Sequence, residues 1–202
     1  MNDDILFWKH EWMSIVEAQK AALRKDVDRL TKSDFEQTGE EELANQLCTK
    51  YSLEVPKLGV DDISVKQREI NIDVSRDRMR YSSSGGPHYL KGTAIDVRVP
   101  FQGDRGMFEI KPNTWTTSIP RGRLEGNSVL FTISGIDLSP AQVKSDIDRQ
   151  IADLQLWLGF QEQSVGSFPV ELAQVAKQAL IVRKKKLSAD ADLISGLGYK
   201  ME

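Results

Sequence analysis

The sequence predicts an α+β protein with a small antiparallel sheet of four to six sequential strands, flanked by a long N-terminal helix and a C-terminal helical hairpin. Two observations predict this fold. Apolar residues recur every three or four positions at both ends of the 202-residue chain, and they alternate with polar residues in its middle. Helices followed by consecutive strands and then helices are typical of α+β domains. We expect one domain over 1–202, with a helical part over 1–55, strands over 56–136, and the hairpin with a C-terminal tail over 137–202.

The first expected element is an amphipathic helix over 3–32. Its apolar positions share helical spacing, which leaves one face in need of a partner: Ile5, Trp8, Trp12, Ile15, Val16, Leu23, Val27 and Leu30. A second helix is expected over about 40–51. Three glutamates at 40–42 suit its positive N-terminal end, and Pro56 follows it as a stop signal.

The central part of the chain changes to period two. Alternating apolar positions predict strands around 70–74, 95–101, 108–110 and 129–133, each with one apolar and one solvated face. Glycine and polar residues separate these strands. The composition predicts a flexible loop over 82–87, a hairpin connection over 102–106 and a turn over 125–127.

The C-terminal part returns to helical spacing. Ser139 and Pro140 are typical of a helix start, and an apolar stripe from Val143 to Leu158 follows them. A break over 159–169 and a second helix over about 169–187 predict an antiparallel hairpin. A short last helix is expected near 189–196.

Composition excludes several classes of protein. No apolar run approaches the roughly 20 residues that span a bilayer, and the N-terminal Met-Asn-Asp-Asp lacks the positive charge of a secretory signal. The single cysteine can form no internal disulfide, which fits a reducing compartment. We therefore expect a cytoplasmic protein without membrane contact. Two histidines and one cysteine are too few for a typical zinc site, and no metal or cofactor is expected.

Positive charge is concentrated in the middle of the chain. Residues 76–123 contain nine basic and four acidic side chains, whereas residues 1–62 contain eight basic and fourteen acidic ones. Guanidinium groups suit phosphate oxygens. Six arginines therefore form the candidate site for nucleic acid or an anionic nucleotide: Arg76, Arg78, Arg80, Arg98, Arg121 and Arg123. The alternative is a charged surface that pairs with acidic groups of this protein or of a partner protein.

A second candidate site consists of Asp96, Glu109 and Lys111. A Mg²⁺-dependent nuclease of the PD-(D/E)xK type has an acidic residue on one strand and Glu-x-Lys on the next, so that both carboxylates bind the metal. Glu109 and Lys111 would share a strand face. A solvated sheet face also produces Glu-x-Lys, Pro112 follows directly, and no Pro-Asp precedes Asp96. We therefore interpret these residues as polar surface and predict no catalytic residue.

Two scattered stretches carry a resemblance to a known family. They comprise Val99–Asp104, Met107–Phe108, Lys111–Trp115, Pro120–Arg121 and Gly126–Asn127 in one part, and Phe168, Arg183–Leu187 and Leu197–Tyr199 in the other. The pattern resembles the N-terminal region of large uncharacterised bacterial proteins. In these a restriction-endonuclease-like PD-(D/E)xK domain commonly follows, and the family is similar to phage-defence or restriction systems. The resemblance implies that the catalytic motif lies in that downstream domain, so it assigns no catalytic residue to this chain.

These patterns lead to one functional expectation and two alternatives. We expect a non-catalytic recognition or assembly domain, with a sensor or regulatory role in a bacterial antiviral-defence protein. It would control an effector domain or partner protein by binding a ligand, nucleic acid or protein. The first alternative is the Mg²⁺-dependent nuclease. The second is a protein-interaction or homo-oligomerisation module that makes no nucleic-acid contact.

Overall fold

The computed structural model describes residues 4–75 and 88–197 and confirms the α+β fold class. Contacts between residues divide the chain into two compact units, and the expectation of one domain over 1–202 stays a prediction. The sheet unit comprises the residues up to Lys9 together with Val55–Gln161. The helical unit comprises His10–Glu54 together with the residues from Glu162 on. Each unit has its own buried residues and is described by itself.

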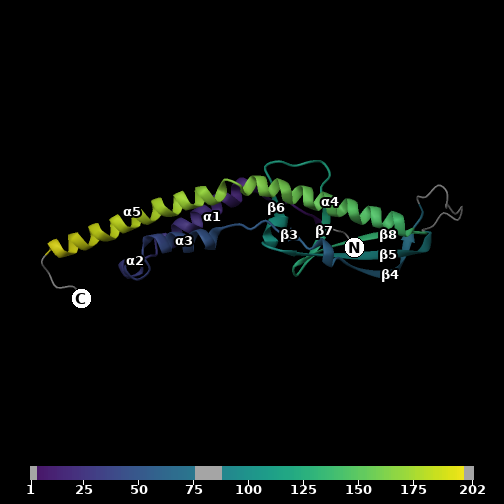
Figure 1. The fold of residues 1–202 in the computed structure, drawn as a ribbon, viewed down its shortest axis with the longest axis horizontal. Coiled ribbons are helices and arrows are strands. Elements are labelled where there is room, and N and C mark those ends of the chain that lie inside the picture. The colour runs from purple at the N-terminus through teal and green to yellow at the C-terminus, as the bar shows by residue number, and fades with distance from the viewer. Residues whose placement is uncertain (1–3, 76–87, 198–202) are drawn as a thin grey trace. The chain divides into compact units, whose positions relative to one another are not determined.

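The sheet unit is built on one antiparallel sheet of six strands (Figure 1). The strands are β1 (Asp4–Ile5), β3 (Lys57–Leu58), β4 (Ser64–Asp73), β5 (Tyr89–Gln102), β7 (Arg121–Glu125) and β8 (Ser128–Gly135). Their order is β1-β7-β8-β5-β3, and β4 also pairs with β5. The long strand β5 therefore has β8 along one edge and both β4 and β3 along the other. Most of the sheet's contacts depend on this central strand.

One face of the sheet is covered by α4 (Pro140–Val165), as Figure 1 shows. Alternation along β5 and β8 places Val97, Val99 and Phe131 on that face, where they are buried. Ile147 and Ile151 of α4 pack against them. The stripe that the sequence predicts for this helix is therefore the stripe that contacts the sheet. The expected N-cap is also present, because Ser139 Oγ accepts a hydrogen bond from the Gln142 backbone N–H at 3.3 Å.

The apolar residues of β4 lie on the opposite face from those of β5. The register pairs Ile70 with Gly92 and Ile72 with Leu90, so both isoleucines share a face with Asp96. Gly92 leaves the space that Ile72 fills, because a Cβ there would lie 2.3 Å from Ile72 Cδ1. The alternation that predicts β4 is thus confirmed. Its isoleucines, however, lie on the face that bears Asp96, whereas the buried residues of β5 and β8 lie on the face that packs against α4.

The N-terminal helix begins later than the sequence predicts. Residues 4–11 form β1 and β2 (His10–Glu11), and the helix α1 covers Trp12–Val27. Leu6 and Phe7 are neighbours in sequence and both are buried, which a single amphipathic stripe does not allow. Phe7 has a positive φ of 57°, so the backbone turns there and cannot continue a helix. Tertiary packing of these two side chains overrides the apparent helical spacing.

The helical unit contains α1, α2 (Lys32–Thr38), α3 (Glu40–Tyr51) and α5 (Phe168–Gly196). The helix expected over about 40–51 is confirmed as α3, whereas α2 was not predicted. Thr31 and Asp34 form a capping box at the start of α2. The buried face of α5 packs against α1 and α3, and it consists of Phe168, Leu172, Ala176 and Leu180.

The predicted hairpin at the C-terminal end is wrong in its packing. Gly159 lies within α4, and only Gly166 and Ser167 separate α4 from α5. Residues 140–161 of α4 pack in the sheet unit, whereas α5 packs on α1 and α3. Neither helix therefore buries its apolar face against the other: α4 packs on the sheet, and α5 packs on α1 and α3. The short last helix expected near 189–196 is the continuation of α5.

Of the three connections that the sequence predicts in the middle of the chain, one differs from the prediction, one is confirmed and one lies outside the described residues. Residues 102–106 lead from β5 into a short 3₁₀ helix, Arg105–Glu109, and not into a hairpin. Beyond it, β6 (Ile110–Lys111) lies outside the six-stranded sheet. The turn over 125–127 is confirmed as the β7–β8 connection, with Gly126 at a φ of 55°. The expected loop over 82–87 lies outside the described residues. A second 3₁₀ helix, Val60–Asp62, precedes β4.

Within 4–75 and 88–197, the structure contains no helix long and apolar enough to cross a bilayer.

Candidate anion-binding site

The face of the sheet that bears Asp96 and Arg98 carries a row of four side chains from four strands, and three of the four are polar. The register places Ser64 of β4 opposite Arg98 of β5. Leu130 of β8 pairs with Arg98 on one side and with Arg123 of β7 on the other. Side chains directly opposite each other in antiparallel strands share a face. One cross-strand row therefore runs from Ser64 through Arg98 and Leu130 to Arg123.

Asp96 lies in the next row and is held by two neighbours. Both of its carboxylate oxygens accept hydrogen bonds from Arg68, at 2.7 and 3.1 Å, and Thr132 Oγ1 donates a third at 2.7 Å. The hydrogen bonds from Arg68 and Thr132 hold the pKa of Asp96 below its usual value, against partial burial of the carboxyl. The positive charge of Lys66, directly opposite on β4, acts in the same direction. Asp96 is therefore a fixed carboxylate that orients Arg68.

The two rows surround a hollow of about 210 Å³ on this face. Its side chains include Ser64, Lys66, Arg98, Arg123 and Thr132, around Asp96. Arg98 forms an ion pair with Glu125 at 2.6 Å, but both side chains are about half exposed. Solvent screens such a pair, so it contributes little to stability and can exchange for another anion. Among the described residues, Lys66 has no ion-pair partner.

The charge balance of this face favours anions. Lys66, Arg68, Arg98 and Arg123 contribute four positive charges, against two negative charges from Asp96 and Glu125. The hydroxyl group of Ser64 adds a hydrogen-bond donor beside the cations, whereas that of Thr132 already donates to Asp96. Guanidinium, ammonium and hydroxyl donors around one hollow are the groups that bind phosphate oxygens. The hollow can therefore accept an anionic group.

The structure brings together two of the six predicted arginines. Arg98 and Arg123 belong to the same cross-strand row and line the hollow. Arg121 lies on β7 two residues before Arg123, so alternation places it on the same strand face, where it is exposed. Arg76, Arg78 and Arg80 lie outside the described residues. Their expected place on one side of an extended segment stays a prediction.

Sequence reasoning missed Lys66, Ser64 and Thr132 as members of this site. Ser64 and Lys66 precede the isoleucines that predict β4, and they are exposed polar residues of a kind found on any strand. A signal was available in the period of two, because Ser64, Lys66 and Arg68 alternate with Val65 and Gln67. Which strand lies beside β5 depends on register, and one sequence does not contain that information.

The three residues of the nuclease alternative have separate partners. Asp96 binds Arg68 and Thr132, whereas Glu109 ends the 3₁₀ helix and forms an ion pair with Lys9 at 2.8 Å. Lys111 is part of β6, outside the sheet that contains Asp96. The expectation that Glu-x-Lys occupies a strand next to Asp96 is therefore wrong. No cluster of three or more histidine, cysteine, aspartate or glutamate side chains suited to a metal ion occurs among residues 4–75 and 88–197.

Lys111 instead contacts two tryptophan rings. Its Nζ lies 4.3 Å from the ring centroid of Trp8 and 4.9 Å from that of Trp115. The two indoles meet edge to face at 5.6 Å. A cation over aromatic faces is attracted by the negative charge at the centre of each ring. Lys111 thus packs against the two indole rings, which is a structural role.

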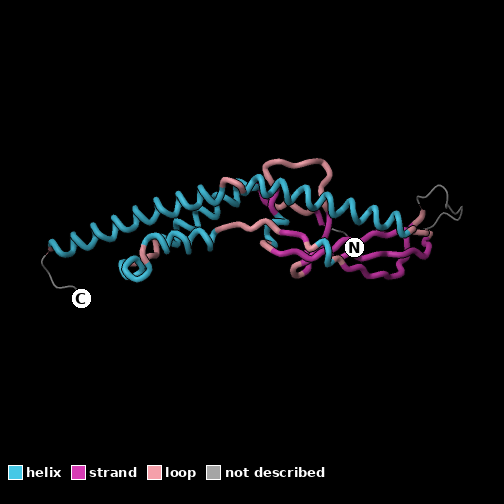
Figure 2. The backbone as a smooth tube through the Cα atoms, viewed as in Figure 1, coloured by secondary structure: helices cyan, strands magenta, loops and turns pink. Residues whose placement is uncertain are grey.

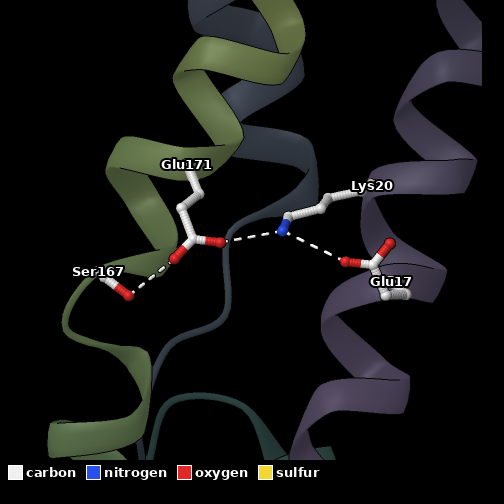
Figure 3. Close-up of polar contacts among 4 residues, drawn as sticks. All are labelled: Glu17, Lys20, Ser167 and Glu171. Carbon is white, nitrogen blue, oxygen red and sulfur yellow. Dashed lines mark hydrogen bonds and ion pairs between the residues drawn. The ribbon is translucent and has the colours of Figure 1, made fainter.

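The helical unit has its own polar cluster, which joins α1 to α5 (Figure 3). Lys20 Nζ of α1 donates to Glu171 at 2.9 Å and to Glu17 at 3.3 Å, while Ser167 Oγ donates to the other oxygen of Glu171. The hydrogen bond to Glu171 raises the pKa of Lys20, although partial burial opposes the shift. The hydrogen bonds from Lys20 and Ser167 lower the pKa of Glu171. All charges in this cluster are paired, which indicates that it stabilises helix packing.

Comparison with known proteins adds no further assignment. The chain matches no protein-family model, and no curated protein or solved structure is significantly similar to it. The resemblance to the N-terminal region of bacterial defence-type proteins therefore stays a prediction.

Proposed function

We propose that this chain is a non-catalytic recognition domain whose sheet face binds a phosphate-bearing ligand, either nucleic acid or an anionic nucleotide. One observation carries the proposal: the side chains of Lys66, Arg98 and Arg123 come from three different strands and line one hollow. Convergence of three cations from separate strands on one hollow is more typical of an anion-binding site than of an ordinary solvated surface. The hydroxyl group of Ser64 adds a neutral hydrogen-bond donor beside them.

The partners of the fixed charges support recognition without bond breaking. Asp96, the carboxylate inside the hollow, has its oxygens occupied by Arg68 and Thr132. A general base or metal ligand needs an accessible oxygen. The arrangement instead provides Arg98, whose carboxylate partner Glu125 is exposed and can exchange for another anion. Such a site binds and releases anions without changing them.

A role in controlling an effector rests on the resemblance to bacterial defence-type proteins. In that family, the region that this chain resembles comes before a restriction-endonuclease-like domain. Binding of a phosphate-bearing ligand to the sheet face would then report the presence of foreign nucleic acid or of a signalling nucleotide to the effector.

Binding of a labelled oligonucleotide, followed by fluorescence anisotropy over a range of salt concentrations, tests the proposal. Because phosphate contacts release counterions, log Kd should rise linearly with log salt concentration. Lys66→Ala should weaken binding and reduce the slope by about 1. Lys66 suits the test because no ion pair with a described residue is lost when it is replaced. A mononucleotide competitor distinguishes a nucleotide site from a strand-binding site.

Lys25→Ala is the matched control, since Lys25 is an exposed lysine of α1 in the other unit. It removes the same charge and should leave both the affinity and the salt slope unchanged. Equal losses in the two variants would indicate nonspecific attraction. Absence of binding by the unmodified protein at low salt to either probe would contradict the proposal.

A further inference from the structure

We propose that the second half of α5 is a self-association surface, on which α5 of a second copy packs in the antiparallel direction. The surface, here called the α5 stripe, consists of five residues of α5 and the residue that caps its C-terminal end: Ala179, Val182, Lys186, Asp190, Leu193 and the cap Leu197. This inference is independent of the anion-binding site, because the stripe belongs to the helical unit.

The six residues lie on one side of the helix. Their spacings are three or four residues, and at 3.6 residues per turn they fall within an arc of about 80°. From Leu180 onward, this arc differs from the face of α5 that packs inside the helical unit. On that inner face Leu180 is buried in the core. Arg183 Nε donates a hydrogen bond to the Leu30 carbonyl at 2.9 Å, and Lys184 Nζ donates one to Glu40 at 3.0 Å.

The stripe is apolar and uncovered over most of its length. Val182, Leu193 and Leu197 have exposed fractions of 58%, 66% and 58%. Every residue from Ser188 to Leu197 is exposed, and Figure 2 shows that α5 continues as a helix beyond α1, α2 and α3. A helical segment that packs on nothing is only marginally stable in water. A packing partner would supply the missing stabilisation.

The stripe begins in a groove that can accept the end of another helix. A hollow of about 460 Å³ lies between α1 and α5, and Val175, Ala179 and Val182 line it on the α5 side. Arg24 and Asp28 border it on the α1 side. The groove is mostly apolar with a charged border, as protein-protein contact surfaces commonly are.

The order of residues along the stripe identifies the occupant as a second copy. In an antiparallel pair of α5 helices that cross at the level of Ser188, Lys186 of one copy lies opposite Asp190 of the other. The two-fold axis generates this ion pair twice. The same register places Val182 opposite Leu193, and Ala179 in the groove opposite Leu197. The apolar ends thus meet apolar ends over about 27 Å of helix, at 1.5 Å per residue. In a parallel pair Lys186 would face Lys186, and like charges would repel each other.

A charge-swap experiment tests both the association and its direction. Sedimentation velocity over a range of protein concentrations should show a monomer-dimer equilibrium for the unmodified chain. Lys186→Glu and Asp190→Lys should each weaken dimerisation at least tenfold, because each places like charges opposite each other. An equimolar mixture of the two variants should form a heterodimer with near-original affinity. Restoration by mixing cannot come from the ion pair that Lys186 and Asp190 also form within one helix.

Two apolar variants complete the test. Leu193→Glu should abolish the dimer, whereas Ile181→Glu should preserve it. Ile181 is 50% exposed and lies on the same helix but outside the arc of the stripe. Circular dichroism establishes that the variants keep their helical content. A strictly monomeric unmodified chain would overturn the proposal, and so would a dimer that Lys186→Glu leaves intact or that mixing fails to restore.

Discussion

Asp96 shows how an ionised side chain can connect neighbouring strands of a sheet. Its carboxylate joins three strands, because Arg68 belongs to β4, Asp96 to β5 and Thr132 to β8. The side chain is 28% exposed, so it is neither deeply buried nor fully solvated. A carboxylate that accepts several hydrogen bonds is stabilised in its charged form, which lowers its pKa. The energy of these contacts therefore depends on pH.

The stability of the protein should decrease in acid, and Asp96 should contribute to the decrease. The folded-state pKa of Asp96 lies below the ordinary value of 3.8. Its contribution is therefore fully present above that ordinary value and is lost as the pH falls through the lower folded-state pKa. In Asp96→Asn, the free energy of unfolding should be lower near neutral pH and should fall less steeply as the pH decreases below 3.8.

Urea unfolding at several pH values measures this effect. Asp61→Asn serves as a control, since Asp61 is an exposed carboxylate of the same unit outside the hollow. A slope in Asp96→Asn that equals that of the unmodified protein would show that the contacts with Arg68 and Thr132 contribute nothing to folding.

Elements with a regular apolar stripe were predictable from the sequence, and elements that depend on register or on a buried turn were not. The stripes from Val143 to Leu158 and around Leu43 and Leu47 correspond to α4 and α3, because each helix buries one continuous face. The segment before Trp12 has helical spacing as well, but Leu6 and Phe7 are both buried there. Spacing describes a possible face, whereas the partner that covers the face is set by tertiary contacts.

The candidate site was predictable to a similar extent. The concentration of arginines in the middle of the chain indicated the region, and Arg98 and Arg123 do meet in one hollow. Lys66 was missed because its place depends on the pairing of β4 with β5. Glu109 and Lys111 were expected on a regular strand, but Glu109 ends a 3₁₀ helix and only Ile110 and Lys111 form a strand.

At the scale of elements, the attachment of α4 to the 3₁₀ helix and β6 depends on one buried amide. Gln161 is completely buried, and its Nε2 donates to the backbone carbonyls of Met107, at 2.5 Å, and Ile110, at 2.8 Å. Its Oε1 accepts no hydrogen bond, and it is the only buried side-chain oxygen or nitrogen among the described residues of which this is true. The amide nitrogen therefore stabilises the contact of α4 with the 3₁₀ helix and β6, while the amide oxygen remains without a hydrogen bond.

Replacement of this amide should destabilise the sheet unit. Gln161→Leu removes the donor and leaves two buried carbonyls without it, which should cost about 2 kcal/mol in the free energy of unfolding. Gln161→Glu should cost more, because a carboxylate would face two carbonyl oxygens. Chemical denaturation measures both effects. Gln155→Leu makes the same change at an exposed position of α4 and should be close to neutral; an equal loss there would refute the role of the buried amide.

At the scale of the whole molecule, the chain enters the sheet unit twice. The residues up to Lys9 belong to it, the chain then forms α1, α2 and α3 of the helical unit, and it returns at Val55. Phe7 is fully buried in the sheet unit, where its ring lies 5.4 Å from that of Phe108 and 5.6 Å from that of Trp157. The Phe7 backbone N–H also donates to the Phe108 carbonyl. The first described residues are therefore part of the core of a unit whose other residues begin some 45 positions later.

Loss of the Phe7 side chain should destabilise the sheet unit strongly although it lies close to the start of the chain. Phe7→Ala removes a large buried ring and should cost about 3 to 5 kcal/mol. Met13→Ala, at a residue that is 58% exposed, is the matched control and should change stability by less than about 0.5 kcal/mol. Hydrogen exchange should show the loss of protection in β5 and β8. Unchanged protection of these strands would contradict the assignment of residues 4–9 to the sheet core.

The placement of the four tryptophans gives the protein an intrinsic optical reporter. Trp8, Trp115 and Trp157 lie in the sheet unit, whereas Trp12 is the single tryptophan of the helical unit. The indole N–H of Trp157 donates a hydrogen bond to the Ser118 carbonyl at 2.7 Å. Emission intensity will therefore be dominated by one half of the chain. Because indole emission responds to nearby charge and to water, the ammonium group of Lys111 makes two of these fluorophores sensitive to any event that displaces it. A mutant with Phe in place of Trp12 would convert the natural chromophores into a label for a single folding unit.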